Sequence, residues 1–222
     1  SPSAGDAFTT ETITVSGTVN DPTVTSVTLG IDLPSTALLG PYNFDDGDES
    51  EWTTTGLWNA TNTFKSTARV SSGTYSLAYT DNTKKNFCTG ACEGSGFEVN
   101  GTPNQGTATS GTFVVGDNTQ LTLSTWYDTE PGNMFDKKII EIVDSSGAVV
   151  ATLGAINDMP PMIGFMPDFN ATPGTVYTNS MMFGSTPQIF LPFGQQMSTL
   201  TAITLDIPAS LLGQTVALRF SF

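Results

Sequence analysis

The stretch KIIEIVDSSGAVVATL, residues 138–153, predicts the fold class. Two apolar, β-branched runs, Lys138–Val143 and Ala148–Leu153, flank the sequence Asp144-Ser145-Ser146-Gly147. Residues of these four types are typical of a tight turn, and the flanking runs have the composition of strands. The stretch therefore predicts an antiparallel β-hairpin.

Short strands separated by turns continue on both sides of this hairpin. Near the C-terminus, Val216, Leu218, Phe220 and Phe222 fall on one face of a predicted strand at Thr215–Phe222. No stretch repeats its apolar residues with the 3.6-residue period of an α-helix. We therefore predict an all-β chain, a jelly-roll-type antiparallel β-sandwich, with further strands at Thr74–Tyr79, Thr112–Val115, Gln120–Tyr127 and Thr201–Ile207.

The composition narrows the class of function. The 222 residues include 7 Lys and Arg against 21 Asp and Glu, which gives a formal net charge of −14 at pH 7. Such a chain lacks the clustered cations that neutralise nucleic-acid phosphates. It has no histidine, which excludes Ser-His-Asp and Cys-His catalysis and histidine-containing zinc sites. We expect a protein that is not an enzyme and does not bind nucleic acid.

The composition also has a secretory character, with 13% charged residues and abundant Gly and Pro. No apolar run approaches the roughly 20 residues of a membrane-spanning helix, and no signal-peptide pattern opens the chain. We expect an extracellular or cell-surface protein without a membrane span, from which a signal peptide has been removed. Three N-x-S/T triplets are candidates for N-glycosylation, at Asn59, Asn100 and Asn170.

The two cysteines lie in the sequence Cys88-Thr-Gly-Ala-Cys92. This spacing differs from the C-x-x-C redox motif, and a structural zinc site needs four ligands. In an oxidising compartment we expect a local disulfide between Cys88 and Cys92, and two free thiols are the alternative.

The chain divides by composition into a leader, an N-terminal β segment and a sandwich. Residues 1–10 (SPSAGDAFTT) are expected to form a flexible leader. Residues 11–40 show alternating apolar residues followed by turn signals, which predicts a β-hairpin or the start of an Ig-like unit. The sandwich is expected over residues 41–222, with a Met- and Pro-rich insertion at 155–197.

The insertion at 155–197 carries six of the seven methionines and almost no charge. A segment of this length in a compact domain tends to be functional, and Met adapts to irregular partner surfaces. The alternative is that its Phe residues fold back as a lid over the core, and both interpretations can hold together. The predicted partner contacts are Phe8, Ile13 and Val15 near the N-terminus and Met159, Met162, Phe165, Met166, Met181, Met182 and Phe183 in the insertion.

An acidic patch, FDDGDESEW at residues 44–52, precedes the sandwich strands. Ca²⁺ takes six to eight oxygen ligands, and carboxylates clustered around a glycine supply several from one loop. The order of residues does not match an EF-hand loop. We predict a structural Ca²⁺ held by Asp45, Asp46, Asp48 and Glu49, and the alternative is a solvated acidic turn.

Five stretches, taken in order, resemble a known module: residues 17–39, 44–59 (FDDGDESEWTTTGLWN), 72–82, 121–147 (beginning LTLSTWYDTE) and 205–222. They are similar to a jelly-roll module of secreted bacterial and archaeal surface proteins, related to MAM domains and to the modules C-terminal to immune-inhibitor-A-type peptidases. The resemblance spans residues 12–222 except the insertion. It implies a binding, adhesive or assembly role, and a Ca²⁺ for which Asp128, Glu130 and Asp136 are the distant ligands.

In these modules a further strand usually follows the one that corresponds to Thr215–Phe222. A sandwich without that strand has an open edge, which invites strand addition from another chain. We therefore predict a pilus-like filament or surface-layer subunit, a homo-oligomer or polymer in which Phe8–Val19 is the donated strand. One alternative is that the sequence is a piece of a longer protein. The other is a carbohydrate-binding or adhesive module that stacks a glycan on Trp58, Tyr79 and Tyr127.

Overall fold

The computed structural model describes residues 39–62, 70–84, 86–87, 104–129, 136–178, 184–192 and 200–222, and only the backbone of Cys92–Glu93 and Phe97–Glu98. All of these residues belong to the unit Ala37–Phe222. The expected leader at 1–10 and almost all of the expected β segment at 11–40 lie outside the described residues.

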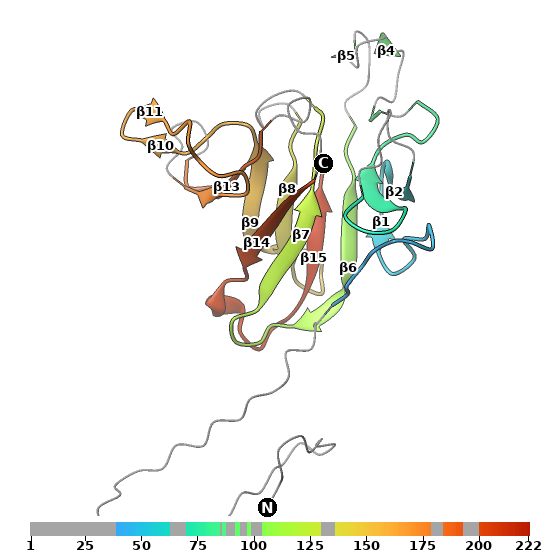
Figure 1. Cartoon of the computed structure of the whole chain (residues 1–222). Helices are drawn as coiled ribbons and strands as arrows, with labels where there is room; N and C mark the ends of the chain where they lie inside the picture. Colours follow the sequence, from blue (N-terminus) through green and yellow to red (C-terminus); the bar gives the residue numbers. More distant parts are fainter. Residues whose placement is uncertain are drawn as a thin grey trace, which may run out of the picture. The chain divides into compact units, whose positions relative to one another are not determined.

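The larger layer is a seven-stranded sheet with the strand order β1-β6-β15-β8-β9-β13-β12 (Figure 1). Every pair of neighbours is antiparallel except β9 and β13, which run parallel. The strands are β1 (Thr53–Thr54), β6 (Thr107–Val114), β15 (Thr215–Ser221), β8 (Ile139–Val143), β9 (Val149–Asn157), β13 (Gln188–Phe190) and β12 (Val176–Tyr177).

The central hairpin of this sheet, β8–β9, is the one predicted from residues 138–153. The Asp144 amide and the Ala148 carbonyl close its turn at 2.9 Å, and Gly147 takes the left-handed conformation with φ of +83°. Asp144 Oδ1 accepts hydrogen bonds from the Ser146 hydroxyl and amide, which lower the pKa of the carboxyl. The turn is therefore held by the Asp, Ser and Gly residues that predicted it.

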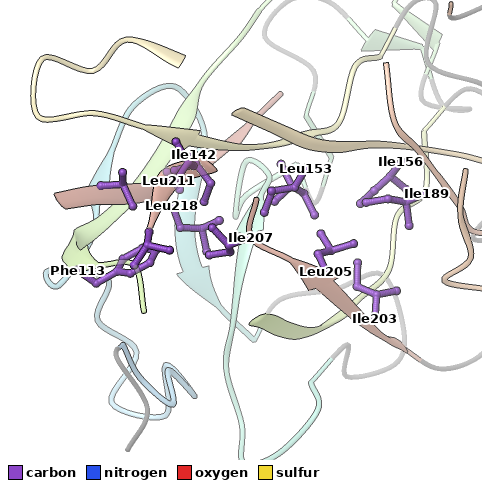
Figure 2. Close-up of a cluster of buried hydrophobic side chains, with 14 of the residues drawn as sticks. Phe113, Ile142, Leu153, Ile156, Ile189, Ile203, Leu205, Ile207, Leu211 and Leu218 are labelled. Atoms are coloured by element: carbon purple, nitrogen blue, oxygen red, sulfur yellow. The ribbon is translucent and has the colours of Figure 1, made fainter. Parts of the chain in front are cut away.

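The smaller layer consists of two antiparallel strands, β7 (Gln120–Thr125) and β14 (Thr201–Asp206), which pair in regular register. It lies in front of the larger sheet in Figure 1. Ile203 and Leu205 of β14 face Leu153, Ile156 and Ile189 of the larger sheet, and the buried residues of both layers form one core (Figure 2). A 3₁₀ turn, η2 (Ala209–Leu211), closes one end of this core with the buried Leu211.

An aromatic cluster closes the side of the core next to β15. Trp52 stacks on Phe220 with the ring centroids 5.5 Å apart, and Tyr79 stacks on Phe222 at 4.3 Å. Trp58 contacts both Phe220 and Tyr79 from a separate antiparallel pair, β2 (Trp58–Thr61) with β3 (Ser76–Tyr79). The alternation predicted for the last strand is confirmed for Val216 and Leu218, which belong to the core, and for Phe220, which packs against it.

The prediction of an all-β sandwich is confirmed. Among the residues that the structure describes there is no α-helix, and hence no helix long and apolar enough to cross a membrane. The prediction of a wholly antiparallel sandwich needs one correction, since β13 pairs parallel with β9. The physical reason is that part of the insertion at 155–197 enters the sheet, where Ile189 and Leu191 are fully buried.

Candidate interaction surfaces

A small hairpin within the insertion projects from the end of the larger sheet (Figure 1). It pairs β10 (Met162–Ile163) with β11 (Met166–Pro167) around a two-residue turn. The first turn residue, Gly164, has a φ of +64°, as two-residue hairpin turns with the right strand twist require. Four large apolar side chains are exposed in this hairpin and directly after it, Phe165 by 89%, Phe169 by 82%, Ile163 by 67% and Met166 by 66%. These four residues form what we call the apolar tip.

The apolar tip decides between the two interpretations of this part of the insertion. Phe165 and Met166 face solvent, as predicted partner contacts should. The lid interpretation is wrong for Phe165 and Phe169, which do not fold back over the core. Met159 and Met162 are only half-buried. The remaining predicted contacts, Phe8, Ile13, Val15, Met181, Met182 and Phe183, lie outside the described residues.

A buried polar group, which we call the polar anchor, holds the base of this hairpin. It consists of Asn157 and Gln188, both fully buried, and Tyr177. Asn157 Nδ2 donates to Gln188 Oε1 at 2.5 Å, and Asn157 Oδ1 accepts from the Met159 amide at 2.8 Å. The Tyr177 hydroxyl donates to the Met159 carbonyl and lies 3.3 Å from Asn157 Oδ1. Both backbone groups of Met159 are thereby fixed where the chain leaves β9.

Lys138, which precedes β8, is the one buried cation among the described residues, with 8% of its surface exposed. Its Nζ donates to Thr129 Oγ1 at 2.9 Å and to the Asp136 carbonyl at 2.6 Å, and it lies 4.7 Å from the centroid of the Tyr127 ring. Burial lowers the pKa of Lys138 to about 8, although Asp136 and Asp158 oppose the shift. Burial likewise raises the pKa of Tyr127. Sequence reasoning missed both this lysine and the polar anchor, because isolated polar residues at strand ends resemble ordinary turn residues.

Four of the five carboxylates of the acidic patch, those predicted to bind Ca²⁺, accept hydrogen bonds from backbone amides. Asp45 Oδ1 accepts from the Thr74 amide at 2.7 Å, and Glu49 Oε2 accepts from the Ala60 amide at 2.9 Å. Asp46 Oδ1 accepts from the Asp48 amide at 3.1 Å. Asp48 accepts from both the amide and the hydroxyl of Ser50, which lowers the pKa of its carboxyl. The patch therefore fixes its own turn and joins it to the strands β2 and β3.

The predicted distant Ca²⁺ ligands are placed apart from this turn along the chain. Asp128 follows β7, Asp136 uses its carbonyl to accept from Lys138, and Glu130 lies outside the described residues. In the described ranges, no three Asp, Glu or Cys side chains are grouped so that they would hold a metal ion. Ca²⁺ binding stays a prediction.

The outer edge of β7 is a regular strand edge without a partner among the described residues. The Ile207 amide donates to the Thr119 carbonyl at 3.0 Å, and hydrogen-bonded pairs alternate along an antiparallel ladder. The backbone N–H and C=O groups of Gln120, Thr122 and Ser124 therefore point away from β14. At one end of this edge, the Ser124 hydroxyl contacts Ser71 at 3.2 Å.

The other edges of the two sheets are blunted. β6 has an extra residue opposite Ala217–Arg219, and β-bulges of this kind disfavour pairing at an edge. β12 has only two residues. Next to β14, the backbone of Gly174 approaches the Ala202 carbonyl so closely that a Cβ would meet this oxygen at 3.3 Å. Of the described edges, that of β7 is therefore the best suited to accept a strand.

The aromatic residues proposed for glycan stacking do not form a flat platform. Tyr127 is buried and donates its hydroxyl to the Leu191 carbonyl at 2.9 Å. Trp58 and Tyr79 meet edge to face, with 67° between their ring planes. Two rings at this angle do not present one surface to a sugar.

The candidate modification sites differ in what the structure shows. Cys88 lies outside the described residues, and only the backbone of Cys92 is described, in the short strand β4 (Cys92–Glu93) that pairs with β5 (Phe97–Glu98). Asn59 donates its side-chain amide to the Leu57 and Thr80 carbonyls at 2.8 Å each, which contradicts a solvent-facing glycan at this position. Asn100 lies outside the described residues, and Asn170 is exposed beside the apolar tip.

No protein-family model, no curated protein and no solved structure matches this chain. The relation to MAM-like modules therefore stays a prediction, and function must be argued from the surfaces themselves.

Proposed function

We propose that this protein is a non-catalytic, extracellular structural subunit that assembles into a surface filament or layer by strand complementation. The observation that carries the proposal is the regular outer edge of β7, along which Gln120, Thr122 and Ser124 present backbone donors and acceptors that pair with no other strand in the part of the chain that the structure describes. A strand from another copy that pairs here adds to a layer of only two strands, opposite a layer of seven.

A strand that pairs with the outer edge of β7 would also bury apolar side chains that are now partly exposed to water. Leu121 and Leu123 of β7 are only half-buried, as are Phe44 and Phe220, which pack against the same core. A donated strand with apolar residues at alternate positions covers such side chains on one face. Ile13, Val15 and Val19 of the N-terminal region have this spacing. The donor is therefore proposed to be Phe8–Val19 of a neighbouring copy.

The charge of the chain bears on assembly, because subunits with a net charge of −14 repel one another. Pairing through backbone hydrogen bonds and apolar side chains avoids this repulsion, and salt or divalent cations weaken it. Assembly should therefore strengthen as ionic strength rises. Weaker assembly at high salt would contradict a contact built from backbone and apolar groups.

The experiment blocks the edge without disturbing the ladder between β7 and β14. In Thr122→Pro the lost N–H is one that points outward, and proline is tolerated at strand edges for this reason. Thr204→Pro is the matched control, since Thr204 pairs with Thr122 and its N–H points to the opposite edge, that of β14. Light scattering and electron microscopy of the full chain should show assemblies for the wild type and Thr204→Pro, and monomers for Thr122→Pro. A monodisperse wild-type monomer, or equal assembly of both variants, would refute strand complementation at this edge.

The alternative, a carbohydrate-binding or adhesive module, has less support because Trp58, Tyr79 and Tyr127 form no platform. A glycan array with the wild-type protein separates the two functions. Specific glycan binding that is lost in Trp58→Ala, in a protein that stays monomeric, would favour the alternative.

A further inference from the structure

The exposed apolar side chains are confined to two opposite ends of the larger sheet. Nine large hydrophobic residues are exposed among those that the structure describes. Four form the apolar tip, and Val176 lies on β12 near the same end. The other four form what we call the apolar base: Val114, Val149, Val150 and Leu212, each between 37% and 54% exposed.

Strand directions place these groups at opposite ends. β9 begins with Val149 and Val150 and runs to Asn157, after which the chain enters the β10–β11 hairpin. Val114 is the last residue of β6 and pairs with Thr215, the first residue of β15, just after Leu212. Val143 links the two sides of the base, since it pairs with Val149 and with Ala217 of β15. Figure 1 shows the β10–β11 hairpin beyond one end of the sheet and the end of β6 at the other.

The tip is built to make a contact rather than left exposed by chance. The polar anchor holds both backbone groups of Met159 at the foot of the hairpin, and the Asp168 amide donates to the Pro161 carbonyl at 2.8 Å. Residues 159–167 contain no charged side chain in a chain with 21 acidic residues. A fixed, uncharged, projecting group of apolar side chains marks an interaction site.

We propose that the apolar tip of one copy docks on the apolar base of the next, in a head-to-tail contact. This inference rests on the proposed assembly function and specifies its geometry. A projecting hairpin is convex and does not complement a second copy of itself, whereas the base offers exposed apolar side chains of the same chain at the far end of the sheet. A contact between two different patches is heterologous, and repeating it without closure generates a filament with a direction.

The contact also identifies its partner as a second copy rather than a membrane. An anionic membrane surface repels a chain with a net charge of −14. A bilayer that bound the apolar tip would also leave the apolar base, at the other end of the sheet, exposed to water. Between copies, Ile163, Phe165 and Met166 bring apolar surface to the neighbour from a stretch, residues 159–167, that carries no charge, and both patches leave water together.

The test uses two variants of the full chain, each of which disables one end. The tip variant is Phe165→Ser with Met166→Ser, and the base variant is Val149→Thr with Leu212→Ser. All four side chains are exposed, so circular dichroism should show unchanged melting, and each variant controls for the other. Sedimentation should show that the critical concentration for assembly rises by roughly tenfold or more for each variant, because a few central apolar residues dominate such contacts.

A head-to-tail contact makes a further prediction for mixtures. The tip variant keeps an intact base and the base variant keeps an intact tip, so an equimolar mixture should form dimers that do not grow. A tip-to-tip contact would instead leave the base variant assembling like the wild type, and this result would overturn the proposal. Binding of the wild type, but not of the tip variant, to phosphatidylcholine vesicles with unchanged assembly would overturn it in favour of a membrane.

The test of the head-to-tail contact and the test of strand complementation can give different results. If Thr122→Pro abolishes assembly while the tip and base variants assemble normally, strand complementation stands and the head-to-tail contact is refuted. If the tip and base variants fail and Thr122→Pro assembles normally, the head-to-tail contact stands and the strand-complementation proposal fails.

Discussion

The acidic patch at residues 44–52 and the apolar tip, formed by Ile163, Phe165, Met166 and Phe169, are stabilised in opposite ways. In the acidic patch, the carboxylates themselves bind the backbone: Asp45 accepts from the Thr74 amide, and Glu49 accepts from the Ala60 amide. In the apolar tip, the exposed apolar side chains contact solvent, and the buried residues of the polar anchor hold the backbone at the foot of the hairpin. Side chains that already stabilise the local fold need no ligand to explain them. Exposed apolar side chains on a fixed support are not explained by the local fold, and the tip is therefore the stronger candidate for an interaction site.

The largest expected effect concerns the support of the tip. Asn157→Ala removes the buried donor of Gln188 Oε1 and the acceptor of the partly buried Met159 amide. Stranding buried polar groups costs about 1–3 kcal/mol for each group, so we expect the free energy of unfolding to fall by about 3 kcal/mol. Urea denaturation measures this loss, and hydrogen exchange should show faster exchange of the Met159 amide.

Asn170→Ala is the matched control for that substitution, since Asn170 is an exposed amide at the foot of the same hairpin. Surface substitutions of this kind usually change stability by no more than about 0.5 kcal/mol. If Asn157→Ala were as mild as Asn170→Ala, the polar anchor would not support the tip, and the contrast between the two regions would fail.

The second effect is a dependence on pH that originates at Lys138. Its pKa is about 8 in the folded protein and near 10.4 in an unfolded chain, so between these values the unfolded state binds more protons. Stability therefore rises with pH in this window, by about 2 kcal/mol between pH 8 and pH 10. Above pH 10 the trend reverses, because burial raises the pKa of Tyr127 and Tyr177 and the unfolded state loses its tyrosine protons first.

The variant Lys138→Met tests the origin of this slope. Asp136 and Asp158 act on Lys138 through their charge, and Tyr127, whose pKa burial raises, lies against it. Urea denaturation at several pH values should give a rise for the wild type and a flat profile for Lys138→Met. The same rise in both proteins would place its origin elsewhere.

Strands with local signals could be predicted from the sequence, and those with distant partners could not. The β8–β9 hairpin was found because its turn and both its strands lie within sixteen residues, 138–153. The strand β13 is only three residues long, and the residues of β9 with which it pairs, Ala155–Asn157, lie far from it in the sequence. No local pattern therefore marks β13 as a strand. The first half of β6 was missed because its bulge shifts the buried positions from Ala108 and Ser110 to Phe113 and Val115.

The candidate surfaces divide in the same way. The exposure of Phe165 and Met166 was predictable because apolar residues without strand periodicity or charge stand out in an acidic chain. Val149 and Val150 of the apolar base belong to a predicted strand, and such residues are normally assigned to a core. They are exposed only because β9 begins at the end of the sheet, and this follows from the packing of the layers rather than from the local sequence.

The smallest expected effect is that of Ca²⁺ on the acidic patch, and it bears directly on the comparison. Loops of extracellular proteins bind Ca²⁺ with dissociation constants of about 0.1–1 mM. At a Ca²⁺ concentration tenfold above such a constant, the free energy of unfolding should rise by about 1.4 kcal/mol. Calorimetry after treatment with EDTA should show heat on addition of Ca²⁺ and a higher melting temperature, and Asp45→Asn with Asp48→Asn should remove both.

The measurement separates two physical descriptions of this patch. Asp48 already uses both carboxylate oxygens on Ser50, and Asp45 uses one on the Thr74 amide, so a bound Ca²⁺ must add to these bonds or replace them. If Ca²⁺ gives neither heat nor a change in melting, then backbone amides alone compensate the crowded carboxylates, and the metal prediction is wrong. If Ca²⁺ stabilises the wild type but not the double variant, the patch binds a ligand after all. The apolar tip would then share its role as an interaction site with the most charged turn of the chain.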